Sequence, residues 1–208
     1  MEKNFIIILR EKIKKLFINE NTGHDISHLE RVRDIAMEIQ KIEGGDKYII
    51  ETAALVHDIH RLMSNELGTF VPAKDSLSVV EKILTDCNVD KTKLPSILEV
   101  VKFHDDKSNK NLPLETLIIQ DADVIDALGE VGLKRTLTFC KTHNIPISNT
   151  NYPLDCKEYV PNTNPISTCH YVYRTMIPEG KNLYTNTAKN IVYNKIEVLE
   201  KFIKENYK

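Results

Sequence analysis

The spacing of the apolar residues is the feature of this sequence that most restricts its fold. Apolar side chains recur at intervals of three and four residues, which is the period of one face of an α-helix. The alternation that is typical of β-strands is scarce. The first stretch shows the helical spacing clearly, with apolar residues at Phe5, Ile8, Leu9, Ile13, Leu16 and Phe17. We therefore predict an all-α fold.

Glycine, proline and asparagine mark the expected ends of the helices. We expect helices over residues 5–17, 25–43, 46–59, 76–86, 94–104, 115–128, 133–141, 166–176 and 187–207. The stretch 49–56 is apolar on nearly all sides, which favours a buried central helix. We expect Asn21-Thr22-Gly23 to follow the first helix, Gly129 and Gly132 to separate two helices, and Pro178-Glu179-Gly180 to interrupt the last but one. Residues 142–164, rich in Asn, Pro, Thr and Ser, indicate a long loop or lid.

Length and composition indicate one globular domain. The chain has 208 residues, of which 41% are hydrophobic and 28% charged, values typical of globular proteins. We expect a single domain over residues 1–208, with a core at about 20–130 and C-terminal helices at 165–208. The net charge of −2 does not favour a nucleic-acid or membrane partner, and no apolar run approaches the roughly 18 residues of a membrane span.

The four cysteines have irregular spacings and include no Cys-x-x-Cys pair, which argues against a zinc knuckle or a redox motif. Reduced, buried thiols are the interpretation that this pattern favours. The start of the sequence has only a short apolar run before Arg10 and no small-residue cleavage site behind it. We therefore expect a cytoplasmic protein. The sequence does not decide between a monomer and a homodimer.

The adjacent residues His57 and Asp58 carry the strongest chemical signal. They follow the apolar run 52–56 within a predicted buried helix, where an imidazole and a carboxylate are costly unless each finds a partner. A divalent cation serves both. On its own, such a dipeptide is more often a structural hydrogen-bonded pair. Further ligands would come from His28, on the apolar face of its helix, and from Asp123, which follows the apolar run 117–119.

Three motifs around these residues resemble the HD-domain superfamily of metal-dependent phosphohydrolases. They are Gly23-His24-Asp25-x-x-His28, Leu55-Val-His-Asp-Ile59 and Asp121-Ala-Asp-Val-Ile-Asp-Ala-Leu-Gly129. The resemblance covers roughly residues 20 to 200 and implies His28, His57, Asp58 and Asp123 as ligands of one divalent transition metal: Mn, Ni, Co, Fe or Zn. The segments Gly132 to Thr136, His170 to Arg174 and Leu183 to Lys189 resemble a bacterial branch that includes nucleotide pyrophosphohydrolases.

The sequence departs from that branch at two positions. Val124 stands where the branch usually has arginine, and Arg174 stands where it usually has lysine. The second change keeps a cation, although the planar fork of arginine differs from the point charge of lysine. The first removes a charge, so the substrate specificity of the branch does not carry over directly to this sequence.

The resemblance implies hydrolysis of a nucleotide, with a nucleoside or deoxynucleoside triphosphate cleaved to monophosphate and pyrophosphate. A cation held in this way lowers the pKa of a bound water towards 7 and neutralises phosphate oxygens. We expect catalytic roles for Asp58 and for His24, which precedes His28 by one helical turn; the alternative for His24 is a surface position at a helix start. A nucleotide monophosphatase or phosphodiesterase, and a non-catalytic nucleotide-sensing module, are the alternative functions.

Charged phosphates need further cations that do not ligate the metal. We expect substrate contacts from Arg61, Lys102, His104, Arg135, His170 and Arg174, and His60 is a further candidate. Each has a structural alternative. His104 ends a helix, where a cationic imidazole is also stabilised; His170 and Arg174 share a helical face that could belong to a lid or to the solvent-exposed surface. Arg135 could form a salt bridge instead, and Asp121 and Asp126 favour hydrogen bonds around the site.

Overall fold

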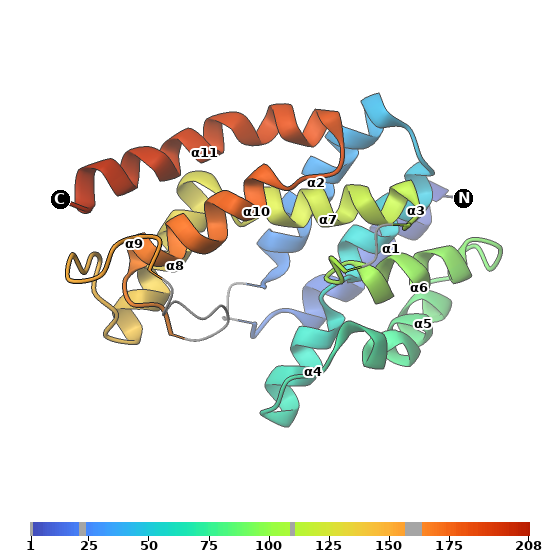
Figure 1. The fold of residues 1–208 in the computed structure, drawn as a ribbon. Helices are drawn as coiled ribbons and strands as arrows, with labels where there is room; N and C mark the ends of the chain where they lie inside the picture. The colour runs from blue at the N-terminus through green and yellow to red at the C-terminus, as the bar shows by residue number, and fades with distance from the viewer. Residues whose placement is uncertain (1, 21–23, 109–110, 157–163) are drawn as a thin grey trace. The chain divides into compact units, whose positions relative to one another are not determined.

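All regular structure in the described part of the chain is helical. The computed structural model describes residues 2–20, 24–108, 111–156 and 164–208, and no strand occurs within these ranges (Figure 1). The prediction of an all-α fold is therefore confirmed. The chain divides into two compact units, Met1–Ala122 and Asp123–Lys208. A single domain over the whole chain stays a prediction.

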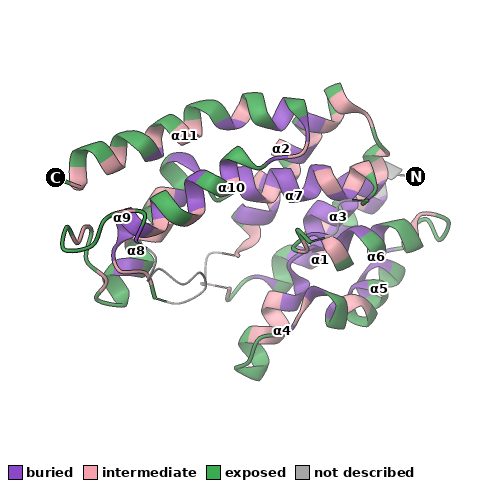
Figure 2. Cartoon of the chain, viewed as in Figure 1, coloured by how far each residue is buried: buried purple, intermediate pink, exposed green. Residues whose placement is uncertain are grey.

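The first unit is built around one central helix. Its elements are α1 (Glu2–Leu16), α2 (Ile26–Glu43), α3 (Lys47–Val56), α4 (Ile59–Leu67), the short 3₁₀ helix η1 (Ala73–Ser76), α5 (Leu77–Asp86), α6 (Leu94–Phe103) and the first part of α7 (Leu114–Asp126). The central helix is α3, because it packs against α1, α2 and α6. Its residues 52–56 are all buried, as the purple colour of this helix in Figure 2 shows. This confirms the prediction of a buried helix at 49–56.

Side-chain caps fix the junction between α2 and α3. Asp25 precedes α2 and accepts a hydrogen bond from the backbone N–H of His28 at 2.9 Å. Gly44 follows α2 with φ +88°, a left-handed conformation that glycine adopts without steric cost. Asp46 then caps α3 by accepting from the N–H groups of Tyr48 and Ile49. These boundaries agree with the sequence prediction.

The helix predicted over residues 46–59 ends earlier than expected. It stops at Val56, and a separate helix, α4, begins at Ile59. His57 and Asp58 therefore lie at a break between two helices rather than inside one. At Asp58 the backbone leaves the helical region, with φ −94° and ψ 14°. The sequence gives no sign of this break, because neither glycine nor proline lies near it.

The second unit consists of the last turn of α7 and the helices that follow it. These are α8 (Gly129–Thr142), α9 (Thr168–Tyr171), the short π-helical stretch η2 (Val172–Met176), α10 (Ile177–Lys181) and α11 (Asn186–Asn206). The long helix α11 packs against α8 and α10 (Figure 1). Figure 2 shows its outward face as exposed, and its bounds agree with the helix predicted over residues 187–207.

Two boundary predictions in this unit are wrong. Gly129 and Gly132 were expected to separate helices; Gly129 does lie at the boundary, as the first residue of α8 with φ +70°, but Gly132 lies within α8. A Cβ at residue 132 would fall 1.8 Å from the carbonyl oxygen of Ala127, so Gly132 allows a close backbone approach. Pro178 was expected to interrupt a helix, yet it lies in α10, which directly follows the π-helical stretch η2. Helical structure is continuous from Thr168 to Lys181.

The predicted loop at 142–164 is irregular from residue 143 on wherever the structure describes it, since Thr142 is the last residue of α8. Residues 143–156 and 164–167 contain neither helix nor strand. Residues 157–163 lie outside the described residues, as do Asn21, Thr22 and Gly23, so the part of each prediction that falls on them is not addressed. The role of the loop as a lid stays a prediction.

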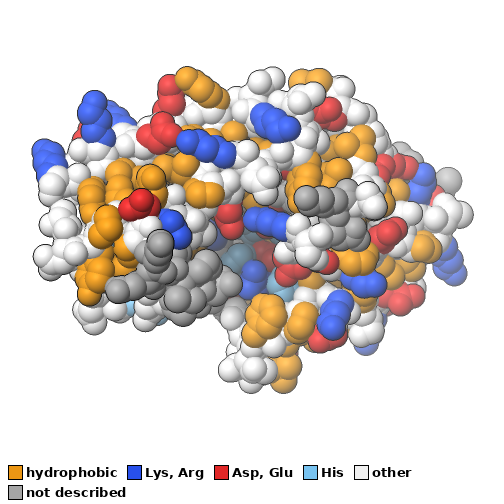
Figure 3. Space-filling model, in the orientation of Figure 1, with side chains coloured by type: hydrophobic (Ala, Val, Ile, Leu, Met, Phe, Trp, Pro, Cys, Tyr) orange, Lys and Arg blue, Asp and Glu red, His pale blue; other side chains and the backbone are white. Residues whose placement is uncertain are grey.

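The distribution of charged residues and cysteines in the structure agrees with what the sequence composition predicts. Basic and acidic side chains are interspersed over the face drawn in Figure 3, as expected from a net charge of −2. All four cysteines are free thiols and buried, as predicted. Among the described residues, the helices are too short or too polar for any one of them to traverse a lipid bilayer.

Candidate metal centre

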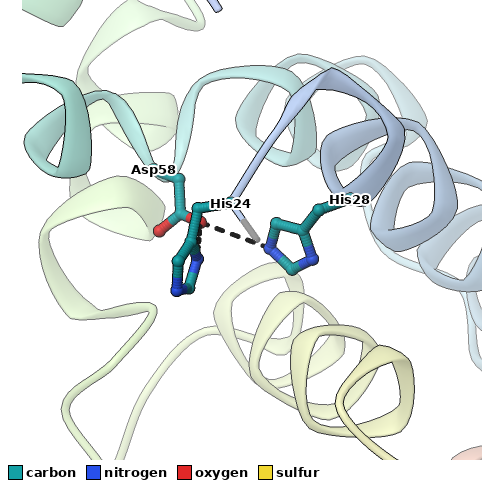
Figure 4. Close-up of side chains that lie close together, drawn as sticks. All are labelled: His24, His28 and Asp58. Atoms are coloured by element: carbon teal, nitrogen blue, oxygen red, sulfur yellow. Dashed lines mark hydrogen bonds and ion pairs between the residues drawn. The ribbon is translucent and has the colours of Figure 1, made fainter. Parts of the chain in front are cut away.

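The carboxylate of Asp58 lies among imidazole rings. Its Oδ2 atom is 2.7 Å from Nδ1 of His24 and 3.2 Å from Nε2 of His28 (Figure 4). Nε2 of His57 lies 3.6 Å from the same oxygen. The side chain of Asp58 is only 3% exposed. One oxygen of a buried carboxylate therefore faces three histidines.

Local structure brings these groups together. His24 lies just before α2, and His28 is in its first turn, where the Asp25 cap fixes the backbone. His57 and Asp58 follow the buried helix α3, which packs directly against α2. The break after Val56 turns the chain at the position of the carboxylate. The site therefore depends on where α2 begins and where α3 ends.

Three buried histidines have the same hydrogen-bonding pattern. Nδ1 of His57 lies 2.9 Å from the carbonyl oxygen of Ala54, Nδ1 of His60 lies 3.2 Å from that of His57, and Nδ1 of His104 lies 2.7 Å from that of Val101. In each case the acceptor is three residues earlier. A carbonyl oxygen can only accept, so each Nδ1 carries a proton, and a ring in its neutral form has its lone pair on Nε2. Such bonds orient imidazoles that bind metals.

The second oxygen of Asp58 faces a different set of groups. Its Oδ1 atom lies 3.6 Å from Nε of Arg61, 3.8 Å from Nε2 of His104 and 3.9 Å from Nδ1 of His60. His60 and His104 are buried, whereas the side chain of Arg61 is 34% exposed. The two carboxylate oxygens thus face two different groups of nitrogen atoms.

The protonation states of Asp58 and His60 follow from this packing. Burial alone would raise the pKa of Asp58, but the charge of His57 and the hydrogen bonds of His24 and His28 outweigh it and hold the pKa well below its usual range. Burial lowers the pKa of His60 to about 4, with Asp58 acting in the opposite direction. At neutral pH the site therefore holds a carboxylate and at least one neutral imidazole.

The donor set suits a divalent cation. The ligand atoms of His24, His28 and Asp58 all lie within 4.8 Å of one another, and so do those of His57, Asp58 and His104. Imidazole nitrogens and carboxylate oxygens are the ligands that Mn²⁺, Fe²⁺, Co²⁺, Ni²⁺ and Zn²⁺ accept. The predicted ligands His28, His57 and Asp58 therefore come together in the first unit. Asp123 lies in α7 and is the first residue of the second unit, so its role as a ligand stays a prediction.

The predicted substrate contacts in the first unit differ in their surroundings. Arg61 and His104 lie at the Oδ1 side of Asp58, as described above. Lys102 is exposed on α6, and its ammonium group lies 4.7 Å from the centre of the Phe103 ring. This cation–π contact is an alternative to substrate binding for Lys102.

The other three predicted contacts belong to the second unit. Nη1 of Arg135 lies 3.5 Å from Asp126, which fits the structural alternative of a salt bridge. His170 is fully buried, with Nδ1 2.7 Å from the hydroxyl of Ser167 and Nε2 3.2 Å from the carbonyl oxygen of Tyr152. Arg174 is exposed in the π-helical stretch. Their role in substrate binding stays a prediction.

His60 is more closely integrated into the site than the sequence indicates. The sequence marks it only as a further cation for phosphate. The structure buries its ring completely, beside His104, with a distance of 5.3 Å between the ring centres. The signal that could have indicated this is its spacing of three residues from His57, because residues three apart lie on the same side of a helical turn.

Comparison with known proteins agrees with this geometry. The HD domain family matches residues 25–128, half of the chain. The Bacillus subtilis protein YpgQ, described as uncharacterized, is 33% identical over 138 residues, which cover 63% of this chain and 64% of YpgQ. The match thus spans slightly less than two thirds of that relative.

Solved structures with the same fold match nearly the whole chain. The Lin1889 protein from Listeria innocua has a TM-score of 0.75 and 27% identity, and the match covers 100% of this chain and 96% of Lin1889. YpgQ from Bacillus subtilis in complex with ADP has a TM-score of 0.75 and 24% identity, covering 98% of this chain and 94% of YpgQ.

Proposed function

Because this chain belongs to the HD-domain family of metal-dependent phosphohydrolases, we propose that it hydrolyses a phosphate ester or anhydride of a nucleotide. The substrate that we propose is a nucleoside or deoxynucleoside triphosphate, cleaved to a monophosphate and pyrophosphate. The observation that carries the proposal is the carboxylate of Asp58, buried among imidazoles whose Nδ1 protons are fixed by backbone carbonyls. The ADP complex of YpgQ supports the choice of a nucleotide.

The residues that would hold the cation are His28, His57, Asp58 and Asp123. The first three lie together around Oδ2 of Asp58, and Asp123 is proposed from the resemblance in sequence. A bound divalent cation supplies Lewis-acid chemistry, by which a water molecule is activated and phosphate oxygens are neutralised.

His24 occupies a position from which it can move a proton. Its Nδ1 atom lies 2.7 Å from Oδ2 of Asp58, and its side chain is 29% exposed, whereas Asp58 is 3% exposed. The ring therefore connects a buried carboxylate with solvent. We propose that His24 holds Asp58 in its orientation and carries a proton between the site and bulk water.

Arg61 is the cation that we propose for the phosphate groups. Its guanidinium approaches Oδ1 of Asp58 at 3.6 Å while its side chain remains 34% exposed. A phosphate entering from solvent would meet this planar donor group and form charge-assisted hydrogen bonds with it. His104 lies beside it at 3.8 Å from the same oxygen.

The test is a panel of nucleotides assayed with several divalent cations, with the products identified. We expect pyrophosphate from triphosphates. Release of orthophosphate would instead indicate a monophosphatase, and cleavage of a single diester bond would indicate a phosphodiesterase. Binding without products would indicate a nucleotide-sensing module.

The residue test is the substitution Asp58→Ala, which should abolish turnover while leaving the helical fold largely intact, as followed by circular dichroism. A matched control is Asp86→Ala, which removes an exposed carboxylate that pairs with Lys12 and should retain turnover. Turnover by Asp58→Ala at the level of the control would contradict the proposed mechanism.

A further inference from the structure

Gln120 is a buried polar side chain that has no part in the proposed reaction. It lies on α7, within the first unit, and is 2% exposed. Its Nε2 atom donates to two backbone carbonyl oxygens, to that of Phe103 at 2.6 Å and to that of Asp106 at 3.0 Å. A side-chain amide nitrogen has two N–H groups, so these bonds use both of them.

The two carbonyl oxygens fix the orientation of this amide. Carbonyl oxygens only accept hydrogen bonds, so the nitrogen atom of Gln120 has to face them. The amide keeps this orientation although its Oε1 atom is buried without a hydrogen-bond partner among the described residues. The opposite orientation would place Oε1 against two other oxygens, which costs more. Gln120 therefore donates specifically to the segment 103–106.

The segment that Gln120 binds is a tight turn at the end of a helix. Helix α6 ends at Phe103, and the backbone N–H of Asp106 donates to the carbonyl oxygen of Phe103 at 3.2 Å. This bond closes a turn over residues 103–106. The two carbonyl groups that Gln120 binds belong to the first and the last residue of the turn, so one side chain of α7 anchors both of its ends.

The second residue of this turn is His104, whose buried ring faces the site. Its Nδ1 atom donates to Val101 at 2.7 Å, and its Nε2 atom lies 3.8 Å from Oδ1 of Asp58. The centre of the ring lies 5.0 Å from that of His57. The direction of the ring depends on the backbone that carries it, so a shift of the turn would move Nε2 away from Asp58.

We propose that Gln120 is a positioning residue, which holds His104 in the site by anchoring both ends of the turn 103–106. This inference deepens the proposed function and rests on it, because His104 is one of the proposed substrate contacts. A glutamine that merely stabilised the fold would lower the free energy of unfolding when substituted, but KM of the folded enzyme would stay unchanged. The two roles therefore differ in a measurable way.

The experiment is a double-mutant cycle of Gln120 and His104, followed by steady-state kinetics with a nucleoside triphosphate and Mn²⁺. Gln120→Met keeps the length of the side chain but removes both N–H donors. We expect KM to rise about 5- to 10-fold, as for the loss of one hydrogen bond to the substrate, with kcat changed by less than about 2-fold. In the variant His104→Ala, the same substitution should change KM by less than about 2-fold, because its effect passes through His104.

Gln40 provides the matched control. Its side-chain amide also donates to a backbone carbonyl beyond the end of a helix, that of Gly45 after α2, at 3.2 Å. Gln40→Met should leave KM unchanged. If circular dichroism shows that Gln120→Met is unfolded, the cycle is run with Gln120→Glu, which has the same shape and offers at most one donor. We expect the same rise in KM, again confined to the chain that retains His104.

A second measurement needs no turnover. The Nδ1–H groups of His57 and His104 donate to carbonyl oxygens of different helices, and both protons can be followed by NMR of the full-length chain without added metal. We expect Gln120→Met to speed the exchange of the His104 proton with solvent about 10-fold or more, because local opening becomes easier. The exchange of the His57 proton should stay unchanged.

The outcomes separate this inference from the proposed function. If folded Gln120→Met has the kinetics of the parent chain, or if it raises KM equally with and without His104, the positioning role is overturned and the proposed function stands. If the parent chain has no turnover, the proposed function is overturned. The exchange of the His104 proton then decides on the positioning role, which an unchanged rate in Gln120→Met would overturn as well.

Discussion

At the scale of single residues, a backbone carbonyl sets the tautomer of three buried histidines. His57, His60 and His104 all donate from Nδ1 to the carbonyl oxygen three residues earlier. This fixes which nitrogen carries the lone pair before any ligand arrives, and it orients the rings. The site therefore requires little reorganisation to accept a cation.

Arg61 provides a test of substrate binding at this scale. The substitution Arg61→Met keeps the apolar stem but removes the charge, and we expect KM for a nucleoside triphosphate to rise about 10- to 100-fold, as expected from a charge-assisted hydrogen bond worth about 1.5–3 kcal/mol. Arg61→Lys should restore part of the effect. Steady-state kinetics of both variants would measure it, and an unchanged KM for Arg61→Met would remove Arg61 from the phosphate-binding groups.

Cys169 gives a residue-scale prediction that does not involve metal. Burial raises the pKa of its thiol to about 11, and all four cysteines are buried. Because the thiolate is the reactive form, we expect the native chain to react with a thiol reagent at pH 8 at least about 100-fold more slowly than the denatured chain. Four rapidly reacting thiols in the native protein would show that the cysteines are accessible.

At the scale of helices, the ends of the elements position the site. The sequence predicted the start of α2, the end of α2 and the start of α3, because Asp25, Gly44 and Asp46 are recognisable capping residues. It did not predict the break after Val56, since apolar residues continue on both sides and no breaker residue marks it. It also misread Gly132 as a separator, because a glycine needed for close packing cannot be distinguished in sequence from one that ends a helix.

The cap of α3 leads to a prediction about stability and pH. Asp46 accepts hydrogen bonds from two N–H groups of α3, and its Oδ2 lies 2.5 Å from Nζ of Lys93. We expect Asp46→Ala to lower the free energy of unfolding by about 1–2 kcal/mol at pH 7. Asp75→Ala, an exposed carboxylate in η1, serves as the control and should have a much smaller effect.

The effect of this substitution depends on pH. Burial would raise the pKa of Asp46, but the hydrogen bond of Lys93 and those of the backbone outweigh it, so the pKa is lowered from its ordinary value of 3.8. Because the pKa is lower in the folded state, the ionised carboxylate of Asp46 contributes fully to stability above its ordinary pKa of 3.8. This contribution is lost as the pH falls through the lower pKa of the folded state. Urea unfolding of both proteins between pH 7 and pH 2 should show a shrinking difference. A difference that stays constant would contradict this assignment.

At the scale of the whole molecule, the sequence predicted the helical class and the proximity of three candidate ligands in the first unit. The order of motifs identified His28, His57 and Asp58, which the fold brings together. The burial of His60 in the site was not predicted, because its ring packs beside His104, which lies far away in sequence. Contacts between distant helices are the part of a site that periodicity and local motifs cannot supply.

Metal binding should be visible in the stability of the whole chain. A ligand that binds only the folded state at 100 times its Kd stabilises by about 2.7 kcal/mol. We therefore expect Mn²⁺ to raise the Tm of the chain and a chelator to reverse the change, whereas Asp58→Asn should show little response. Differential scanning calorimetry measures this. An equal rise in Tm for Asp58→Asn would place the stabilising ion elsewhere.

The carbonyl groups that hold His57 and His104 belong to the last turns of α3 and α6, where helices leave carbonyls without backbone partners. The end of each of these two helices therefore also determines which ring nitrogen of His57 or His104 carries the proton. A mutation that extended either helix by a turn would offer those oxygens new amide partners and release the rings to swap tautomers. Such a change could silence the enzyme without touching any side chain that binds the cation.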